Sequence, residues 1–223
     1  MQVHKTCISL NNNNFCFFHP LNDSCYGGTL AGIQKNEFDI NKIKFQEDDL
    51  FIDIGCNIGL VSMVFAKVFP FIKIYSFDAN PIAIKCLELS LAENSINNIT
   101  SFNLAIGAEN KKDLKFVTFD EQQSCLIQKE YSPDDRDKTY SCDMINLADF
   151  FDNNKIEKVK ALKIDIEGGE FPLFDYLFNQ RPDILDKIEY LICEIHPLDD
   201  SVPKSKTLKE KLIFKFGSNL RLS

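Results

Sequence analysis

The chain has 223 residues, of which 44% are hydrophobic and 26% are charged, a balance that is typical of a globular protein. The 25 basic and 33 acidic side chains give a net charge of −8, which disfavours nucleic acid and anionic membranes as partners. No apolar run approaches the roughly 18 residues of a membrane span, and the N-terminus lacks the apolar segment of a secretory signal. We therefore expect a cytoplasmic protein without a membrane span.

The chain contains eight cysteines, with no CxxC motif and no zinc-like pair among them. Cys86 and Cys193 fall within a predicted helix and a predicted strand. A domain of this length does not need disulfides to build a core. We expect all eight cysteines to be reduced and mostly buried thiols.

From residue 48 onward, short apolar runs alternate with helical patterns, which is typical of βα units around a parallel sheet. The predicted strands are residues 50–54, 72–77, 99–105, 159–166 and 188–195. The predicted helices are residues 58–69, 147–151, 171–178 and 207–216, with a further helix that begins at Pro81 after the N-cap Asn80.

Residues 114–119 and 139–145 are predicted to be extended arms around a polar tip, residues 120–138, which we expect to be a loop. Residues 1–45 are expected to form a lead-in of undetermined structure with a turn at residues 11–14. Residues 46–223 are expected to form a single α/β domain around a doubly wound, mostly parallel sheet.

The first predicted strand runs into the sequence Asp-Ile-Gly-Cys-Asn-Ile-Gly at residues 53–59, immediately before a helix. In open parallel sheets, ligands bind beyond the carboxyl ends of the strands, near the point where the strand order reverses. Small residues there let the backbone approach a ligand closely. A dinucleotide fingerprint requires further glycines where this chain has Asn57 and Leu60, so nicotinamide or flavin binding is disfavoured.

The second predicted strand ends at Asp78. A carboxylate at this place can accept hydrogen bonds from both hydroxyls of a ribose. The alternative is that Asp78 only helps Asn80 to cap the following helix. The joint pattern of glycine turn, helix, strand and carboxylate favours nucleoside binding.

These motifs resemble those of the FkbM-type S-adenosylmethionine-dependent methyltransferases. Residues 53–59 are similar to the family's Asp-x-Gly-x-Asn-x-Gly, and Ser-Phe-Asp-Ala-Asn-Pro at residues 76–81 resembles its Phe-Glu-Pro-Asn-Pro segment. The most specific match is Leu-Lys-Ile-Asp-Ile-Glu-Gly-Gly-Glu at residues 162–170. Weaker matches are Asn-Leu-Ala-Ile-Gly at residues 103–107, Ser124, and Ile-Cys-Glu-Ile-His at residues 192–196.

The resemblance implies a Rossmann-like class I methyltransferase fold, S-adenosyl-L-methionine as the cofactor, and O-methylation of a sugar or related small metabolite. By the same resemblance, the end of the first strand lines the methionine half of the cofactor, with Asp53, Gly55, Asn57 and Gly59. Asp78, at the end of the second strand, holds the ribose. The segment that flanks the adenine contains Asn103, Ala105 and Ile106.

Methyl transfer to a hydroxyl needs an acceptor for the hydroxyl proton, and the candidates follow the fourth and fifth predicted strands. Asp165 and Glu167 are two residues apart and are expected to project to one side of the sheet, where burial raises a carboxylate pKa. His196 is a further candidate because its ordinary pKa suits a base. The alternative for Glu167 and Glu170 is stabilisation of the next helix start.

A Mg²⁺ or Mn²⁺ site can also be drawn from these carboxylates and the imidazole, Asp165, Glu167, Glu194 and His196. Nothing in the sequence brings these four groups together, and we expect no metal. The alternative functions are a catalytically silent nucleoside-binding module of the same fold, and an RNA or protein methyltransferase. The acidic charge argues against RNA.

Only one short strand fits after the last predicted helix, where the fold usually closes with an antiparallel pair. An open sheet edge would result. We expect residues 1–45 or a partner to cover that edge, and a dimer formed through it is one option. The third option is a shortened protein of weak activity.

Overall fold

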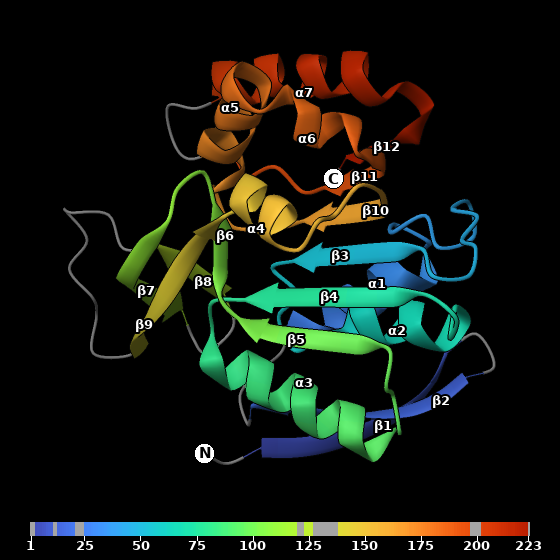
Figure 1. Cartoon of the computed structure of the whole chain (residues 1–223). Coiled ribbons are helices and arrows are strands. Elements are labelled where there is room, and N and C mark those ends of the chain that lie inside the picture. Colours follow the sequence, from blue (N-terminus) through green and yellow to red (C-terminus); the bar gives the residue numbers. More distant parts are fainter. Residues whose placement is uncertain are drawn as a thin grey trace.

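The computed structural model describes residues 3–10, 13–20, 25–119, 123–126, 138–196 and 202–222. Its centre is a sheet of parallel strands in the order β12-β11-β10-β3-β4-β5 (Figure 1). The strand order reverses between β3 and β10, which pair directly. The strands are β3 (Leu50–Ile54), β4 (Lys73–Asp78), β5 (Ile99–Asn103), β10 (Val159–Ile164), β11 (Ile188–Cys193) and β12 (Leu220–Leu222).

Helices cover both faces of this sheet, because successive strand residues point to opposite sides and both sides are apolar. Phe51 packs in one core with α1 (Cys25–Gln34), α2 (Leu60–Val68) and α3 (Pro81–Glu93). Its neighbour Ile52 packs in the other core. That second core is completed by α4 (Leu147–Asn153), α5 (Glu170–Gln180), α6 (Pro182–Asp186) and α7 (Val202–Phe216). The doubly wound α/β prediction is confirmed.

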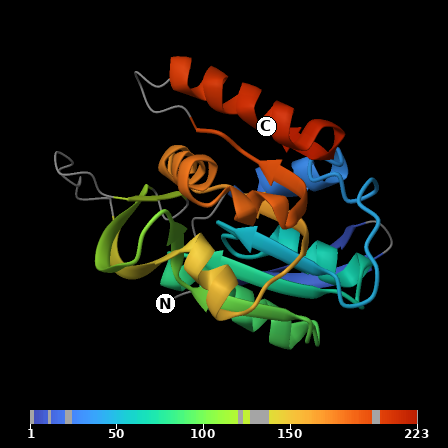
Figure 2. The same cartoon turned by 45° about the horizontal axis from the view of Figure 1, so that its top comes forward.

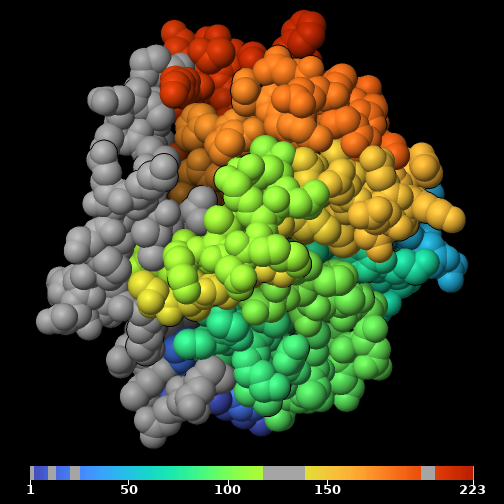
Figure 3. Space-filling model, turned by 60° about the vertical axis from the view of Figure 1, so that its left-hand side comes forward, coloured from blue at the N-terminus to red at the C-terminus, as the bar shows by residue number. Residues whose placement is uncertain are grey.

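A second, four-stranded sheet lies on the side toward which β3, β4 and β5 point (Figures 1 and 2). Its strands follow the order β6-β9-β7-β8 and are β6 (Ala105–Gly107), β7 (Lys111–Phe119), β8 (Gln123–Leu126) and β9 (Lys138–Asn146). Figure 3 shows this sheet, in green and yellow, on the surface of that end of the molecule.

Two predictions about this region were wrong. A single strand was predicted over residues 99–105, but β5 ends at Asn103 and the chain then joins the second sheet, where Ala105 pairs with Met144 of β9. The polar tip was predicted to be a loop, yet β8 lies inside it and pairs with β7. Residues 120–122 and 127–137 of the tip lie outside the described residues, and Lys138 already belongs to β9.

The lead-in contains a hairpin of β1 (Val3–Leu10) and β2 (Asn13–Pro20). Cys7 stands directly opposite Cys16 with 4.0 Å between their Cα atoms, and the two form a disulfide. The prediction that all eight cysteines are reduced was therefore wrong, because strand register brings together two cysteines whose spacing matches no motif. Residues 11–14 were predicted to form a turn, but Asn13 and Asn14 already belong to β2.

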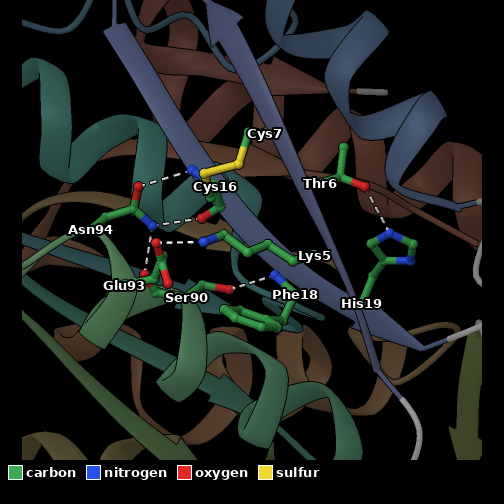
Figure 4. Close-up of a disulfide and its surroundings, with 9 residues drawn as sticks. All are labelled: Lys5, Thr6, Cys7, Cys16, Phe18, His19, Ser90, Glu93 and Asn94. Carbon is green, nitrogen blue, oxygen red and sulfur yellow. Dashed lines mark hydrogen bonds and ion pairs between the residues drawn. A yellow bond between two sulfur atoms is a disulfide. The ribbon is translucent and has the colours of Figure 1, made fainter.

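The hairpin is held against the C-terminal end of α3 (Figure 4). Asn94, which caps α3, accepts a hydrogen bond from the backbone N–H of Cys16 at 2.9 Å and donates to the carbonyl of Cys16. The Ser90 hydroxyl accepts from the N–H of Phe18 at 2.9 Å, and Lys5 forms an ion pair with Glu93. Cys86 and Cys193 are buried in α3 and β11 as predicted, and neither is in a disulfide.

At the other edge of the central sheet, β12 pairs with β11 and follows α7 and a short 3-10 helix (Gly217–Asn219). Within the described ranges, no strand pairs with the outer side of β12. The hairpin lies against α3 instead, so the lead-in does not extend the sheet there. None of the helices in the described part of the chain has the length and apolar character needed to cross a bilayer.

Candidate active site

The turn after β3 has a backbone that glycine makes possible. Gly55 and Gly59 have φ values of +74° and +79°, and Asn57 lies between them at +51°. A Cβ atom on Gly55 would lie 1.7 Å from the carbonyl oxygen of Asp165, so the turn directly contacts the residue that follows β10. Because Gly59 is left-handed, α2 begins at Leu60 and not at residue 58 as predicted.

Asp78, at the end of β4, holds this turn from the other side. Its Oδ2 accepts a hydrogen bond from the N–H of Asn57 at 2.7 Å, and its Oδ1 accepts from the N–H of Asn80 at 2.8 Å. Burial raises the pKa of Asp78 to about 6, although both N–H donors act to lower it. The side chain is partly exposed, and each oxygen keeps a lone pair for a further donor.

Asn80 caps α3 itself, since its Oδ1 accepts from the N–H groups of Ile82 at 2.9 Å and Ala83 at 3.4 Å. The alternative role of Asp78 as an aid to that cap is therefore present, through the N–H of Asn80, alongside its bond to Asn57. Asp78 therefore connects the turn before α2 with the turn before α3.

The segment predicted to flank an adenine begins at Asn103. Its side-chain amide donates to the carbonyl oxygens of Asp78 and Ala79 at 3.0 Å each, which fixes the backbone beside the predicted ribose residue. Asn103 is exposed, whereas Ala105 and Ile106 are buried in β6. The three residues thus connect β4 to the second sheet.

Asp53 is fully buried, so it lies beneath the turn and not on its surface. Its Oδ2 accepts from the Ser62 hydroxyl at 2.6 Å, and that hydroxyl lies 2.8 Å from the hydroxyl of Ser76. Its Oδ1 lies 3.2 Å from the Nζ of Lys163. Sequence reasoning missed Lys163 and both serines, although a lysine within the apolar run 161–164 was an available signal.

The fourth strand, β10, ends at Ile164, two residues earlier than predicted, because the backbone N–H groups that follow it are hydrogen-bonded to Glu170. Its buried carboxylate accepts from the N–H of Ile166 at 3.0 Å and from the N–H of Gly168 at 2.8 Å. Glu167 adopts a φ of +50° in that turn. Glu170 thus binds the turn that precedes α5, and no side chain caps the start of that helix, so the predicted role at the helix start stays a prediction. Strand alternation is not what orients Asp165 and Glu167.

Four carboxylates nevertheless converge on one imidazole. The Nδ1 of His196 lies 3.2 Å from Glu170 Oε1. Its Nε2 lies 3.5 Å from Glu194, 3.7 Å from Glu167 and 3.9 Å from Asp165. His196 follows β11 and the acids come from the ends of β10 and β11 and from the start of α5.

These contacts shift the pKa values of the imidazole and of the carboxylates in different directions. Hydrogen bonds to Glu170 and Glu194 raise the pKa of His196 to about 10, against the opposing effect of burial. Burial raises the pKa of Asp165, which Lys163 and His196 act to lower, and burial likewise raises the pKa of Glu167. The hydrogen bond to His196 lowers the pKa of Glu194. Near pH 7 the imidazole is therefore a cation among acids.

Asp165, Glu194 and His196 each bring one atom of a metal-ligating type within 4.8 Å of the others. A protonated imidazole has no lone pair for a metal, and its raised pKa makes it hard to deprotonate. The same groups also form an ion-paired network around the imidazole. The expectation of no metal stays a prediction.

Among the predicted site residues, Gly55, Asn57, Gly59 and Asp78 form one group at the end of β3 and β4, and Asp165, Glu167 and His196 form a second at the end of β10 and β11. The contact between Gly55 and Asp165 joins the two groups at the reversal of strand order. Ser124 lies in β8, outside both, and its side chain is not described.

Comparison with known sequences decides the family, since residues 53–208 match the methyltransferase FkbM domain, well over half of the chain. The chain belongs to the FkbM methyltransferase family. Its sheet, with β3 and β10 at the reversal point, is the Rossmann-like methyltransferase fold. The matched residues span every strand end of the candidate site.

The FkbM-family chain is similar to Methyltransferase 1 of Beauveria bassiana (strain ARSEF 2860), with 21% identity over 173 residues and 67% of each chain covered. It is also similar to the crystal structure of a methyltransferase FkbM from Methylobacillus flagellatus KT, at 16% identity and a TM-score of 0.44. That match covers 66% of this chain but only 32% of the other, so the chain spans about a third of that protein. The N-terminal domain of human METTL16, in complex with SAH, matches at 13% identity and a TM-score of 0.42, over 83% of this chain and 60% of that one.

Proposed function

We propose that the protein is an S-adenosyl-L-methionine-dependent O-methyltransferase whose acceptor is a hydroxyl of a sugar or related small metabolite. The observation that carries the proposal is the direct contact of Gly55 with Asp165 at the reversal of strand order. This contact puts the turn for a nucleoside cofactor beside a partly exposed carboxylate of raised pKa. Membership of the FkbM methyltransferase family supports it.

The residues present fit the cofactor. Asp78 offers acceptor lone pairs for the two ribose hydroxyls, and the Gly55 to Gly59 turn offers close backbone approach. Asn103 donates hydrogen bonds to the backbone carbonyls of Asp78 and Ala79, and the buried residues Ala105 and Ile106 follow it in the chain. Asp53 is buried and accepts a hydrogen bond from Ser62 of α2, the helix that follows the turn. When bound, the cofactor supplies a methyl group on a sulfonium, which is an electrophile.

Asp165 is the proposed general base. Its oxygen takes the proton of the acceptor hydroxyl as that hydroxyl's oxygen forms a bond to the methyl carbon and the sulfur–carbon bond breaks. Burial raises the pKa of Asp165, and Lys163 acts to lower it. Glu167 is the second candidate for the base, with a carboxylate that also faces His196.

His196 is proposed to act on the carboxylates and not as the base. With a pKa of about 10 it holds its proton at neutral pH, so it has no free lone pair with which to take another. Its charge compensates the acids at the ends of β10 and β11. His196→Gln, which carries no charge, tests this role.

Residues 46–223 are proposed to be the methyltransferase domain, with residues 1–45 as a lead-in that packs on it. Phe15 and Ile40 of the lead-in share a core with α2 and α3, which supports a stabilising role for this segment. Small-molecule acceptors are favoured over nucleic acid by the net charge of −8. A dimer through the outer side of β12 remains a proposal that light scattering tests.

A cytoplasmic location is also part of the proposal, and the Cys7–Cys16 disulfide is the observation that argues against it. Disulfides persist in oxidising compartments and are rare in the cytosol. Thiol trapping of the protein in its native cells, followed by mass spectrometry, reads the state of this pair. A fully oxidised pair would contradict the cytoplasmic location.

The function is tested by calorimetry with S-adenosylhomocysteine, followed by incubation of the protein with methyl-labelled cofactor and a panel of sugars and hydroxylated metabolites. We expect binding that depends on Asp78 and label transfer that depends on Asp165. Binding without transfer to any acceptor would favour the catalytically silent module. Transfer to RNA or protein in parallel incubations would replace the small-molecule acceptor, and tighter binding of NADH would overturn the proposal.

A further inference from the structure

Lys163 carries an almost fully buried ammonium group, with only 6% of its side chain exposed. Its Nζ donates to the carbonyl oxygen of Gly55 at 3.1 Å and lies 3.2 Å from Oδ1 of Asp53. It also donates to Oδ2 of Asp165 at 3.5 Å. The three donors of the ammonium are therefore directed at the cofactor turn, at a buried acid and at the proposed base.

The position of Lys163 follows from strand register. Lys163 of β10 is paired with Asp53 of β3, at the junction where the strand order reverses. Its two neighbours in β10, Leu162 and Ile164, have no exposed surface. Lys163 thus reaches the ends of β3 and of its own strand β10.

A buried lysine at this place is costly for folding alone. Removing an ammonium from water carries a large penalty, and well-packed apolar residues often replace a buried ion pair without loss of stability. Burial does act to lower the pKa of Lys163, but the attraction of Asp53 and Asp165 outweighs it and the net direction is upward. The group is therefore a fixed positive charge, which points to a role in the site.

We propose that Lys163 is a positioning residue that holds the Asp165 carboxylate charged and in place and ties it to the cofactor turn through the Gly55 carbonyl. The inference rests on the proposed function, because it assigns Asp165 as the base. Lys163 itself touches neither reacting atom. It acts through Asp165 on the proton transfer and through Gly55 on the cofactor turn.

Among the charged groups around Asp165, Lys163 is the cation on which the charge of Asp165 depends most. His196 is the other cation, and its Nε2 lies 3.9 Å from Asp165, shared with two further carboxylates. The titratable and charged groups that act on Asp165 are the cations Lys163 and His196 and the acids Asp53, Glu167 and Glu194. Without Lys163, desolvation and the acids are opposed by His196 alone, and Asp165 takes up a proton more readily.

The test measures Asp165 directly and needs no acceptor. Carboxyl-carbon NMR of the full chain, labelled with ¹³C-aspartate and assigned with Asp165→Asn, follows the titration of Asp165 in the wild type and in Lys163→Met. We expect the pKa of Asp165 to rise by about one to three units in Lys163→Met, the size expected on loss of an opposite charge at this distance. Calorimetry in parallel is expected to show about tenfold weaker binding of S-adenosylhomocysteine, because the Gly55 carbonyl loses its charged donor.

Two further variants keep the result interpretable. Lys163→Met leaves Asp53 buried without its cation and can prevent folding. Asp53→Asn/Lys163→Met removes both charges and is expected to show a smaller rise in the pKa of Asp165, because Asp53 is itself one of the acids that raise this pKa. Lys160→Met is the matched control, since Lys160 lies on the same strand and pairs with Glu189 of β11. We expect it to leave the pKa of Asp165 unchanged.

An unchanged or lowered pKa of Asp165 in either Lys163 variant would overturn the inference, as would an equal rise in Lys160→Met. Should neither Lys163 variant fold, the wild-type titration decides, because an Asp165 still protonated at pH 7 beside intact Lys163 contradicts the proposal. A wild type that binds no S-adenosylhomocysteine would instead refute the proposed function. The two failures are thus distinguishable.

Discussion

The Nδ1 atom of His196 lies 3.2 Å from Oε1 of Glu170, a carboxylate whose side chain has no exposed surface. The same carboxylate accepts the N–H groups of Ile166 and Gly168, so one acid joins the end of β10, the start of α5 and the segment after β11. The cation at His196 is therefore part of the support for the whole turn that carries Asp165.

The first prediction concerns stability and pH. The pKa of His196 is raised from 6.5 to about 10 on folding, so its stabilisation is complete below pH 6.5 and is lost as the pH rises to about 10. His196→Gln is expected to melt roughly 5 °C below the wild type at pH 6.5, with the difference shrinking toward pH 10. Scanning calorimetry across this range measures it, and a constant difference would show that His196 is not charged in the folded state.

The second prediction concerns Asp78 and cofactor binding. Hydroxyl donors bind a carboxylate better than a carboxylic acid, and the pKa of Asp78 is raised from 3.8 to about 6 by burial. The affinity for S-adenosylhomocysteine is therefore expected to fall as the pH drops below about 6. Asp78→Ala should bind about 10- to 100-fold more weakly at pH 8 and lose this pH dependence. Equal affinity of the two proteins at pH 8 would rule out the ribose role.

The third prediction concerns the base. Asp165→Asn keeps the size of the side chain and removes its basicity, so kcat is expected to fall by about 10²- to 10⁴-fold with little change in cofactor affinity. Steady-state kinetics and calorimetry measure the two quantities. Glu167→Gln and His196→Gln are compared in the same assay. Full activity of Asp165→Asn with an inactive Glu167→Gln or His196→Gln would move the base to that residue.

The fourth prediction concerns the hairpin disulfide. Cys7 and Cys16 close a short loop, and the chain-entropy account of cross-links gives about 2–3 kcal/mol of stabilisation for such a loop. Cys7→Ser/Cys16→Ser, or the wild type in a dithiol reductant, is expected to melt at a lower temperature. Alkylation before and after reduction counts the thiols that appear. A reductant-insensitive melting temperature, with both thiols alkylated only after reduction, would show that the bond adds nothing.

Much of the central sheet was predictable because its signals are local. The apolar run at residues 50–54 and the Asn80 cap before Pro81 appear in the structure as β3 and the start of α3. The second sheet was less predictable, because β6 pairs in parallel with β9, and a short strand such as Ala105–Gly107 carries little pattern of its own. The Cys7–Cys16 bond likewise depends on hairpin register.

In the candidate site, the sequence indicated which residues follow the strand ends but not how they are supported. Asp78 and Asp165 lie at the ends of β4 and β10 as expected. The burial of Asp53 and the convergence on His196 depend on contacts between elements that are far apart in the chain. Lys163 was passed over because a lysine in a strand is usually read as solvent-facing, whereas its register with Asp53 brings it under the turn.

Because β3 pairs directly with β10, the central sheet cannot be completed until β10 has been synthesised. The ribosome releases β3, β4 and β5 well before β10, so during translation the edge of β3 that later meets β10 has no partner. Parallel pairing between such distant segments forms slowly. A nascent chain stalled before Val159 would carry the complete turn at residues 53–59 and Asp78. It would lack Lys163 of β10 and Asp165 after it, the two residues that contact Gly55 of that turn.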